Sequence, residues 1–155
     1  MDREVRSKER RIRDAAFPVV KTIATFDFKA QPSLKQELFR GLMQGDHIDK
    51  KENVLLVGNS GTGKTHLATA LAYQACCQGR AVRFFSTTSL VTQLLENREE
   101  KQLSKFHRQL ARLHLIVLDE LGYVPFSKAG AELLFKCVSK AYERTSLIVT
   151  LFERR

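Results

Sequence analysis

The chain has 155 residues, enough for one domain with its own core, and its 43% hydrophobic and 28% charged residues are typical of a soluble globular protein. Its apolar stretches are far shorter than the ~20 residues of a membrane span, the charged N-terminus excludes a secretory signal, and three cysteines without metal or disulfide spacing indicate a cytoplasmic protein with reduced thiols. The net charge of +9 makes nucleic acid the first candidate partner, although a merely solvated basic surface would give the same value.

The first 45 residues are predicted as an N-terminal basic helix and linker, followed by a core over residues 46–155. Residues 2–16 predict a helix that carries six Arg or Lys side chains and few apolar positions, so it would pack weakly alone. A second helix is predicted near residues 33–44, where apolar side chains recur on one face, and Gly45 ends it.

The next segment contains a complete phosphate-binding motif, G-x-x-x-x-G-K-[ST]. Residues 53–57 predict a buried parallel strand before it, and a helix follows as far as Gly79. The motif itself consists of Gly58, Asn59, Ser60, Gly61, Thr62, Gly63, Lys64 and Thr65. The glycines let backbone N–H groups turn toward phosphate oxygens, Lys64 would reach the β- and γ-phosphates, and the Thr65 hydroxyl would bind Mg²⁺. The motif therefore predicts a site for ATP or GTP with Mg²⁺.

A basic helix follows the second predicted strand, which covers residues 81–85. The helix at residues 89–97 has an apolar inward face, and the next one, to Leu113, has its cations on one stripe. These cations are Lys101, Lys105, Arg108 and Arg112. The stripe could follow a DNA backbone, and a solvated helix face explains the same pattern equally well. Because no exposed aromatic residues interrupt it, we do not expect it to read base sequence.

Residues 115–120 predict a third strand that ends in two carboxylates. Because ligands bind at the carboxyl edge of parallel sheets, Asp119 would hold Mg²⁺ there, as a Walker B residue does. Glu120 could polarise a water molecule for attack on the γ-phosphate, which favours hydrolysis over a kinase or a Ras-like switch. A buried strand followed by two acids by chance is the alternative.

The last elements complete an α/β pattern. Ser127 is a predicted N-cap for a helix to Glu143, and residues 146–150 predict a fourth apolar strand. This helix is expected to bury Leu133, Leu134, Phe135, Val138 and Tyr142. Strands that alternate with helices around a phosphate loop predict a three-layer P-loop fold with a parallel sheet.

Several of these segments together resemble a known family. They are residues 17–22, 26–28, 52–58, 61–68 and 119–127, the last reading Asp-Glu-Leu-Gly-Tyr-Val-Pro-Phe-Ser. They resemble the IstB-like ATPases, the transposition helper proteins of insertion sequences, which are close relatives of the DnaC helicase loaders in the AAA+ class. The last segment is distinctive of this group, whereas the phosphate loop alone is not.

This resemblance extends to Thr150 and implies a sheet of five parallel strands in the order 5-1-4-3-2. It also implies ATP-dependent self-assembly on DNA without sequence preference, and assistance to a transposase or a replicative helicase. In such proteins the DNA contacts lie partly between the second and third strands, which here is the region of the stripe at residues 101–112. Residues 26–28 would border the adenine pocket.

The resemblance also implies roles for the site residues. The cofactor-binding segment extends one residue beyond the loop, to His66. Thr65 and Asp119 are the implied Mg²⁺ ligands. Lys64 and Glu120 are the implied catalytic residues. The choice of ATP over GTP rests on the resemblance alone.

After the fourth strand the chain departs from the family pattern. The family continues into Thr-Asn-Leu-Pro-Phe, whose Asn senses the γ-phosphate, whereas here Thr150 is followed by Leu151 and Phe152. The fifth strand, the arginine finger and the lid are expected beyond residue 155, so we interpret the sequence as a truncated or frameshifted copy, or a fragment. Residues 53–57 would then form an exposed sheet edge. Since an arginine finger contributes about 10³–10⁵ in rate, we expect negligible ATP turnover.

Three functions therefore stay open. The first is a DNA-stimulated ATPase of the transposition-helper or helicase-loader type, favoured by Glu120 beside Asp119 and by the basic stripe. The second is an ATP-binding DNA or protein interaction module that does not hydrolyse ATP, or a non-functional remnant, favoured by the missing Asn. The third is a small-molecule or nucleoside kinase of P-loop type, which is disfavoured because it would need a substrate pocket and an arginine-bearing lid that the sequence does not show.

Overall fold

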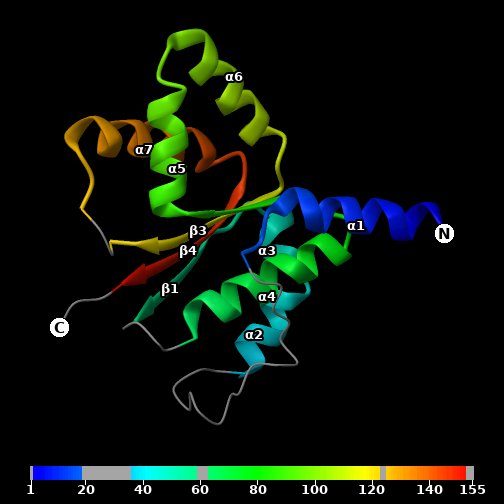
Figure 1. Cartoon of the computed structure of the whole chain (residues 1–155). Coiled ribbons are helices and arrows are strands. Elements are labelled where there is room, and N and C mark those ends of the chain that lie inside the picture. The colour runs from blue at the N-terminus through cyan, green and yellow to red at the C-terminus, as the bar shows by residue number, and fades with distance from the viewer. Residues whose placement is uncertain (1, 19–35, 59–62, 123–124, 153–155) are drawn as a thin grey trace.

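The computed structural model describes residues 2–18, 36–58, 63–122 and 125–152, which form a parallel sheet between two layers of helices (Figure 1). The strands are β1 (Val54–Gly58), β2 (Val82–Ser86), β3 (Leu115–Leu121) and β4 (Ser146–Phe152). The helices are α1 (Arg3–Ala15), α2 (Gln36–Met43), α3 (Asp46–Asp49), α4 (Lys64–Cys77), α5 (Thr87–Glu96), α6 (Glu100–Ala111) and α7 (Lys128–Ala141).

The strand order in the sheet is β1-β4-β3-β2, with every pair parallel. These four strands thus follow the predicted order, and the predicted α/β class with a parallel P-loop sheet is confirmed. The pairing places Val117 of β3 beside Ile148 of β4, and Ile148 beside Val54 of β1. Because β3 and β4 are covered on both faces, their sequences are apolar almost throughout, as the buried strands of parallel sheets are.

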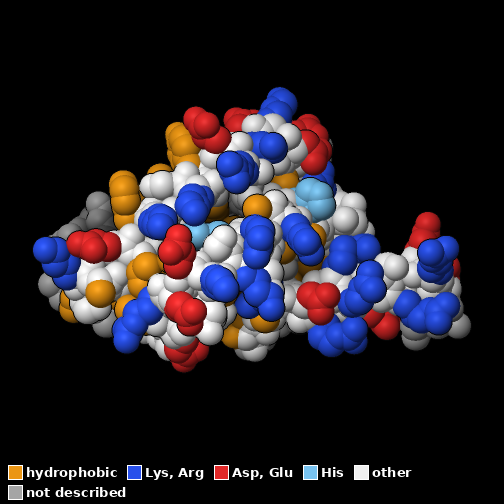
Figure 2. Space-filling view, turned by 90° about the horizontal axis from the view of Figure 1, so that it is seen from above, with side chains coloured by type: hydrophobic (Ala, Val, Ile, Leu, Met, Phe, Trp, Pro, Cys, Tyr) orange, Lys and Arg blue, Asp and Glu red, His pale blue; other side chains and the backbone are white. Residues whose placement is uncertain are grey.

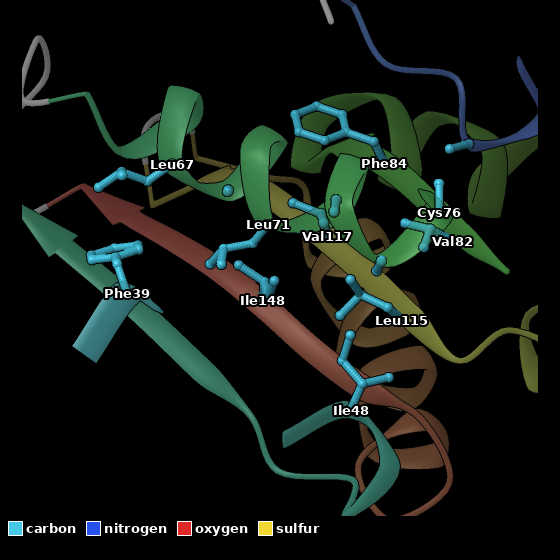
Figure 3. Packing of buried hydrophobic residues seen from close by; sticks show 14 residues of the cluster. Phe39, Ile48, Leu67, Leu71, Cys76, Val82, Phe84, Leu115, Val117 and Ile148 are labelled. Carbon is cyan, nitrogen blue, oxygen red and sulfur yellow. The ribbon is translucent and has the colours of Figure 1, made fainter. Parts of the chain in front are cut away.

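One face of the sheet is covered by α4, and α4 is itself covered by α1 and α2. Figure 3 shows Leu71 of α4 beside Ile148 of β4 in this part of the core. Because other helices cover its outer side, α4 is apolar around most of its circumference rather than along one stripe. The Arg11 Nε of α1 donates a hydrogen bond to the Cys76 carbonyl at 2.9 Å, which holds α1 against the end of α4.

The other face carries α5, α6 and α7, and here one prediction was wrong. Leu134 and Cys137 of α7 are buried against the sheet, but Phe135 is 76% exposed and Tyr142 is 58% exposed. The reason is geometric, since a helix on a sheet buries one stripe and Phe135 lies about 100° around the axis from Leu134. The predicted N-cap is confirmed, because the Ser127 hydroxyl accepts a hydrogen bond from the Gly130 amide at 3.1 Å.

All three cysteines are free, and burial raises the pKa of Cys76 and of Cys137 to about 11, so these two thiols stay protonated. No helix within the described part of the chain is long and apolar enough to cross a membrane.

Strand β1 lies at one edge of the four-stranded sheet, and its side chains on the sheet face opposite α4 are exposed. Val54 and Leu56 pack against the core on the α4 side, whereas Leu55 is 61% exposed and Val57 is 55% exposed on the other side. An apolar edge strand with unpaired backbone groups is a site for pairing with another chain.

We expect the double substitution of Leu55→Lys and Val57→Lys to reduce self-association of this chain. Burying one exposed Val or Leu favours association by about 1.5–3 kcal/mol, so removing two should raise the concentration at which aggregates form by at least roughly tenfold. Light scattering against concentration measures this threshold. The control is Leu38→Lys, which removes a similarly exposed leucine from α2, outside β1. An equal effect of the control would contradict a specific role for β1.

Candidate functional site

The two ends of the predicted phosphate loop meet the carboxyl edge of the sheet. Gly58 ends β1, and Gly63 is the N-cap of α4 with a φ of 85°, a conformation that favours glycine because it has no Cβ. Residues 59–62, the predicted middle of the loop, lie outside the described residues. The first turn of α4 contains no acidic residue, so nothing in that turn neutralises the positive end of the helix dipole. The start of α4 is therefore suited to an anion.

Two side chains of the first turn of α4 point back to the strand ends. Lys64 Nζ donates a hydrogen bond to the Gly58 carbonyl at 2.7 Å. The Thr65 hydroxyl is 2.9 Å from Asp119 Oδ1 and 3.0 Å from Oδ2, and it donates its hydrogen to this carboxylate. The structure thus brings together Thr65 and Asp119, which lie 54 residues apart in the sequence.

Asp119 is buried and held by hydroxyl groups. Its side chain is only 4% exposed. Besides Thr65, the hydroxyl of Thr150 donates to Oδ1 at 2.5 Å, and the hydroxyl of Thr87 donates to the Asp119 backbone carbonyl at 2.8 Å. Within the described residues Asp119 forms no ion pair with Lys, Arg or His. Its negative charge is therefore oriented by neutral donors and is still available to a cation.

Glu120 occupies a bulge in β3. The β3–β4 register shifts between Leu118 and Leu121, so β3 has one more residue than β4 there. Glu120 takes the extra position with a φ of 64°, a left-handed conformation that costs a residue with a side chain about 1–2 kcal/mol. As a result Asp119 faces inward while Glu120, the next residue, is exposed at the same edge. Such strain is common at functional sites.

Thr150 links the two carboxylate residues, and sequence reasoning missed it. Its buried hydroxyl donates to Asp119 Oδ1 and accepts a hydrogen bond from the Glu120 amide at 2.8 Å. One side chain thus fixes both the buried carboxylate and the backbone of the bulge. The available signal was a threonine at the carboxyl end of an apolar strand, because that end meets the ends of the neighbouring strands. Thr87, which begins α5 directly after β2, gave the same kind of signal.

The donor atoms at this site suit Mg²⁺ better than a metal that needs an all-protein cage. The described residues contain no group of three or more His, Cys, Asp or Glu side chains that could hold a metal. Thr65 and Asp119 supply one hydroxyl and one carboxylate. Mg²⁺ is commonly bound through one or two carboxylates, with water and substrate phosphates as its other ligands.

The remaining predicted site residues lie in two places. His66 follows Thr65 in α4 and is half-buried. The four stripe cations, Lys101, Lys105, Arg108 and Arg112, are all exposed, and none forms an ion pair with another described residue. Helix α6 packs with α5 and α7 on the sheet face opposite α4, so the structure does not bring the stripe to the phosphate site. Residues 26–28, predicted near the adenine, lie outside the described residues.

Comparison with protein families gives one match over nearly the whole chain. A family model described as IstB-like ATP-binding protein matches residues 1–153. A Pseudomonas aeruginosa protein named as an ATP-binding protein of insertion sequence IS21 is 36% identical over 148 residues, which is 96% of this chain and 56% of that protein. A Geobacillus stearothermophilus protein named for insertion sequence IS5376 is 35% identical over 150 residues, covering 97% and 60%. The chain thus spans little more than half the length of these relatives.

Solved structures give the same fold at lower identity. The crystal structure of the DnaC helicase loader matches with a TM-score of 0.65 and 24% identity, covering 77% of this chain and 69% of that one. The AMPPCP-bound DnaA of Aquifex aeolicus matches with a TM-score of 0.70 and 19% identity, covering 86% and 42%. These matches support the P-loop AAA+ fold of the described core.

Proposed function

Because this chain belongs to the family of IstB-like ATP-binding proteins, we propose that it binds ATP with Mg²⁺ at the carboxyl edge of its sheet and, with ATP bound, associates with DNA as a helper of a transposase. A replicative helicase is the second candidate partner, because the solved DnaC helicase loader shares the fold. The transposase is inferred from the insertion sequences for which the relatives are named, and the helicase from the name of the helicase loader.

The contact between Thr65 and Asp119 is the observation that carries this proposal. Residues 59–62, and residues 26–28 that the sequence predicts near the adenine, lie outside the described residues, so the proposed nucleotide site depends on how the described side chains meet. A hydroxyl from the start of α4 and a carboxylate from the end of β3 face each other at 2.9–3.0 Å. This pair is the donor set expected for a Mg²⁺ ion that bridges nucleotide phosphates.

Each described residue has a distinct proposed task. The amides at the start of α4 and the ammonium group of Lys64 bind the phosphates, with Lys64 exchanging its contact to the Gly58 carbonyl for phosphate oxygens. Thr65 and Asp119 hold the Mg²⁺, which when bound neutralises phosphate charge. His66 borders the phosphate-binding segment.

Glu120 is the proposed group that orients a water molecule for hydrolysis. It is exposed at the same edge as Asp119, and the bulge together with Thr150 sets its backbone direction. The position after Thr150 is Leu151, which has no polar group to contact a γ-phosphate. We therefore propose slow hydrolysis at this site, and keep the alternative of an ATP-binding module that does not hydrolyse ATP. Measuring ATP binding and phosphate release on the same sample separates the two.

The stripe on α6 is the proposed contact to the DNA backbone. Removal of Lys101 and Lys105 by alanine substitution should weaken binding and reduce the slope of log K against log salt by about 0.9 for each phosphate that is no longer neutralised. The measurement is fluorescence anisotropy of a labelled duplex at several salt concentrations, with and without Mg-ATP. The control pair, Arg40→Ala with Lys128→Ala, removes the same charge from α2 and from the start of α7. Equal effects of both pairs would mean that net charge, not the stripe, attracts DNA.

A further inference from the structure

A basic cavity lies between α6 and α7, in the helical layer on the sheet face opposite α4. Its volume is about 670 Å³. Polar side chains line it from both helices and from the turn that follows α7: Ser104, His107, Arg108, Ser139, Lys140, Tyr142, Glu143 and Arg144. The α6 residues Ser104, His107 and Arg108 follow one another at i, i+3 and i+4, so they lie on one side of that helix and face α7.

The charge of this lining is unbalanced. Arg108, Lys140 and Arg144 contribute three positive charges, and Glu143 contributes one negative charge. None of these four side chains forms an ion pair with another residue in the described segments. Neighbouring cations without counter-ions repel one another, so the arrangement favours an anionic ligand.

His107 adds an unpaired hydrogen-bond donor. Lys140 Nζ lies 3.2 Å from His107 Nδ1, and because an ammonium group has no lone pair, Lys140 donates and Nδ1 accepts. The ring hydrogen is therefore on Nε2, which is buried and has no hydrogen-bond partner among the described residues. Burial lowers the pKa of His107, and the charges of Lys140 and Lys136 lower it further, which keeps the ring neutral.

We propose that this cavity binds a phosphate group of the DNA backbone and continues the α6 stripe onto α7. The inference rests on the proposed DNA-binding function. Arg108 carries the link, because it belongs to the stripe and also lines the cavity. A strand that follows the stripe therefore meets Lys140 and Arg144 next. Figure 2 shows this side of the molecule, where Lys and Arg side chains gather across the middle of the surface.

A backbone phosphate matches the charge and the hydrogen-bond donors of this lining. Phosphate oxygens accept hydrogen bonds from guanidinium and ammonium groups, and the serine hydroxyls of the lining can donate as well. Each phosphodiester of the backbone carries one negative charge. The lining has a net charge of +2, so it can neutralise the phosphate that it binds and attract the next phosphate along the strand. The cavity therefore positions a strand without reading its bases.

The test is DNA binding by a cavity variant. The double variant Lys140→Ala with Arg144→Ala should bind a labelled duplex roughly tenfold more weakly in the presence of Mg-ATP, and its slope of log K against log salt should be lower by about 1. The charge-matched control, Arg40→Ala with Lys128→Ala, should bind as the wild type does. Both residues of the cavity pair are exposed, so the fold should persist.

A second variant gives a change of opposite sign. Glu143→Gln removes the only carboxylate among the described residues of the lining, so it should strengthen duplex binding roughly two- to fivefold at low salt. A third readout is the ring N–H signal of His107 in NMR spectra, identified by its absence in His107→Gln. This signal should move when duplex is added and stay in place when inorganic phosphate is added at the same concentration.

The possible outcomes separate the two proposals. If the wild type binds duplex, and if the cavity variant and Glu143→Gln both bind it with the wild-type affinity, the cavity assignment is wrong and the DNA-binding function stands. If inorganic phosphate alone moves the His107 signal as far as duplex does, the cavity is a site for free phosphate and the assignment to a DNA strand is overturned. If the wild type binds no duplex, with or without Mg-ATP, the proposed function fails and the inference fails with it.

Discussion

Replacement of Lys64 by alanine is expected to abolish the thermal stabilisation that Mg-ATP gives this protein. A ligand at about 100 times its Kd stabilises the folded state by about 2.7 kcal/mol. This raises the midpoint temperature of thermal unfolding by roughly 5–10 °C for a chain of this size. Lys64 is the cation at the start of α4, 2.7 Å from the Gly58 carbonyl at the strand end, so its removal takes away the positive charge that we propose binds the phosphates. The shift should therefore disappear while the unliganded midpoint changes little.

The matched control for this experiment is Lys128→Ala. Lys128 and Lys64 are both the first residue of a helix, α7 and α4 respectively, but Lys128 follows a serine N-cap and belongs to the sheet face opposite α4. Lys128→Ala should keep the full shift with Mg-ATP. If Lys64→Ala keeps it as well, the nucleotide binds elsewhere, and the proposed site is wrong. Parallel scans with Mg-GTP show whether the base matters.

The fold was largely predictable because the buried strands carry a strong signal. β3 and β4 are apolar over most of their length, and a sheet covered on both faces requires this. The helix faces were harder to predict. Phe135 is apolar and adjacent to Leu134, and the sequence alone does not show which side of α7 is covered by the rest of the protein. The exposure of Phe135 depends on tertiary packing, which no pattern within α7 encodes.

The candidate site was predictable at positions where a sequence motif assigns a single role to the residue. Lys64, Thr65 and Asp119 were predicted from motif and position, and the structure brings Thr65 and Asp119 into contact. The bulge at Glu120 was not predicted, because an Asp-Glu pair at a strand end reads equally well as regular alternation. Thr150 was missed for a related reason. Its role depends on the register between β3 and β4, which a single strand does not reveal.

Thr150→Val should destabilise the protein by about 2–4 kcal/mol and lower the unfolding midpoint by roughly 5–15 °C. Valine keeps the shape but has no hydroxyl. Asp119 then loses one of its two side-chain donors, and the Glu120 amide loses its partner inside the bulge. Both effects fall on groups that are wholly or partly buried, where unpaired polar atoms are costly. Thr150→Ser keeps the hydroxyl and should lose only about 1 kcal/mol for the missing methyl group.

Thr145→Val is the control that isolates hydrogen bonding from the change of residue. Thr145 is also buried, directly before the same strand, but its hydroxyl has no partner among the described residues. The identical substitution there should be neutral or stabilising, since it removes an unpaired polar atom. Urea unfolding of Thr150→Val, Thr150→Ser and Thr145→Val measures the difference in unfolding free energy. The rise of the thermal midpoint with Mg-ATP, measured for the same variants, shows whether nucleotide binding changes. If Thr150 orients Asp119 and the bulge, Thr150→Val should also reduce the ATP-induced stabilisation, whereas Thr145→Val should leave it intact. Equal unfolding free energies and equal ATP-induced stabilisation in the two valine variants would contradict a role of the Thr150 hydroxyl in orienting Asp119 and the bulge.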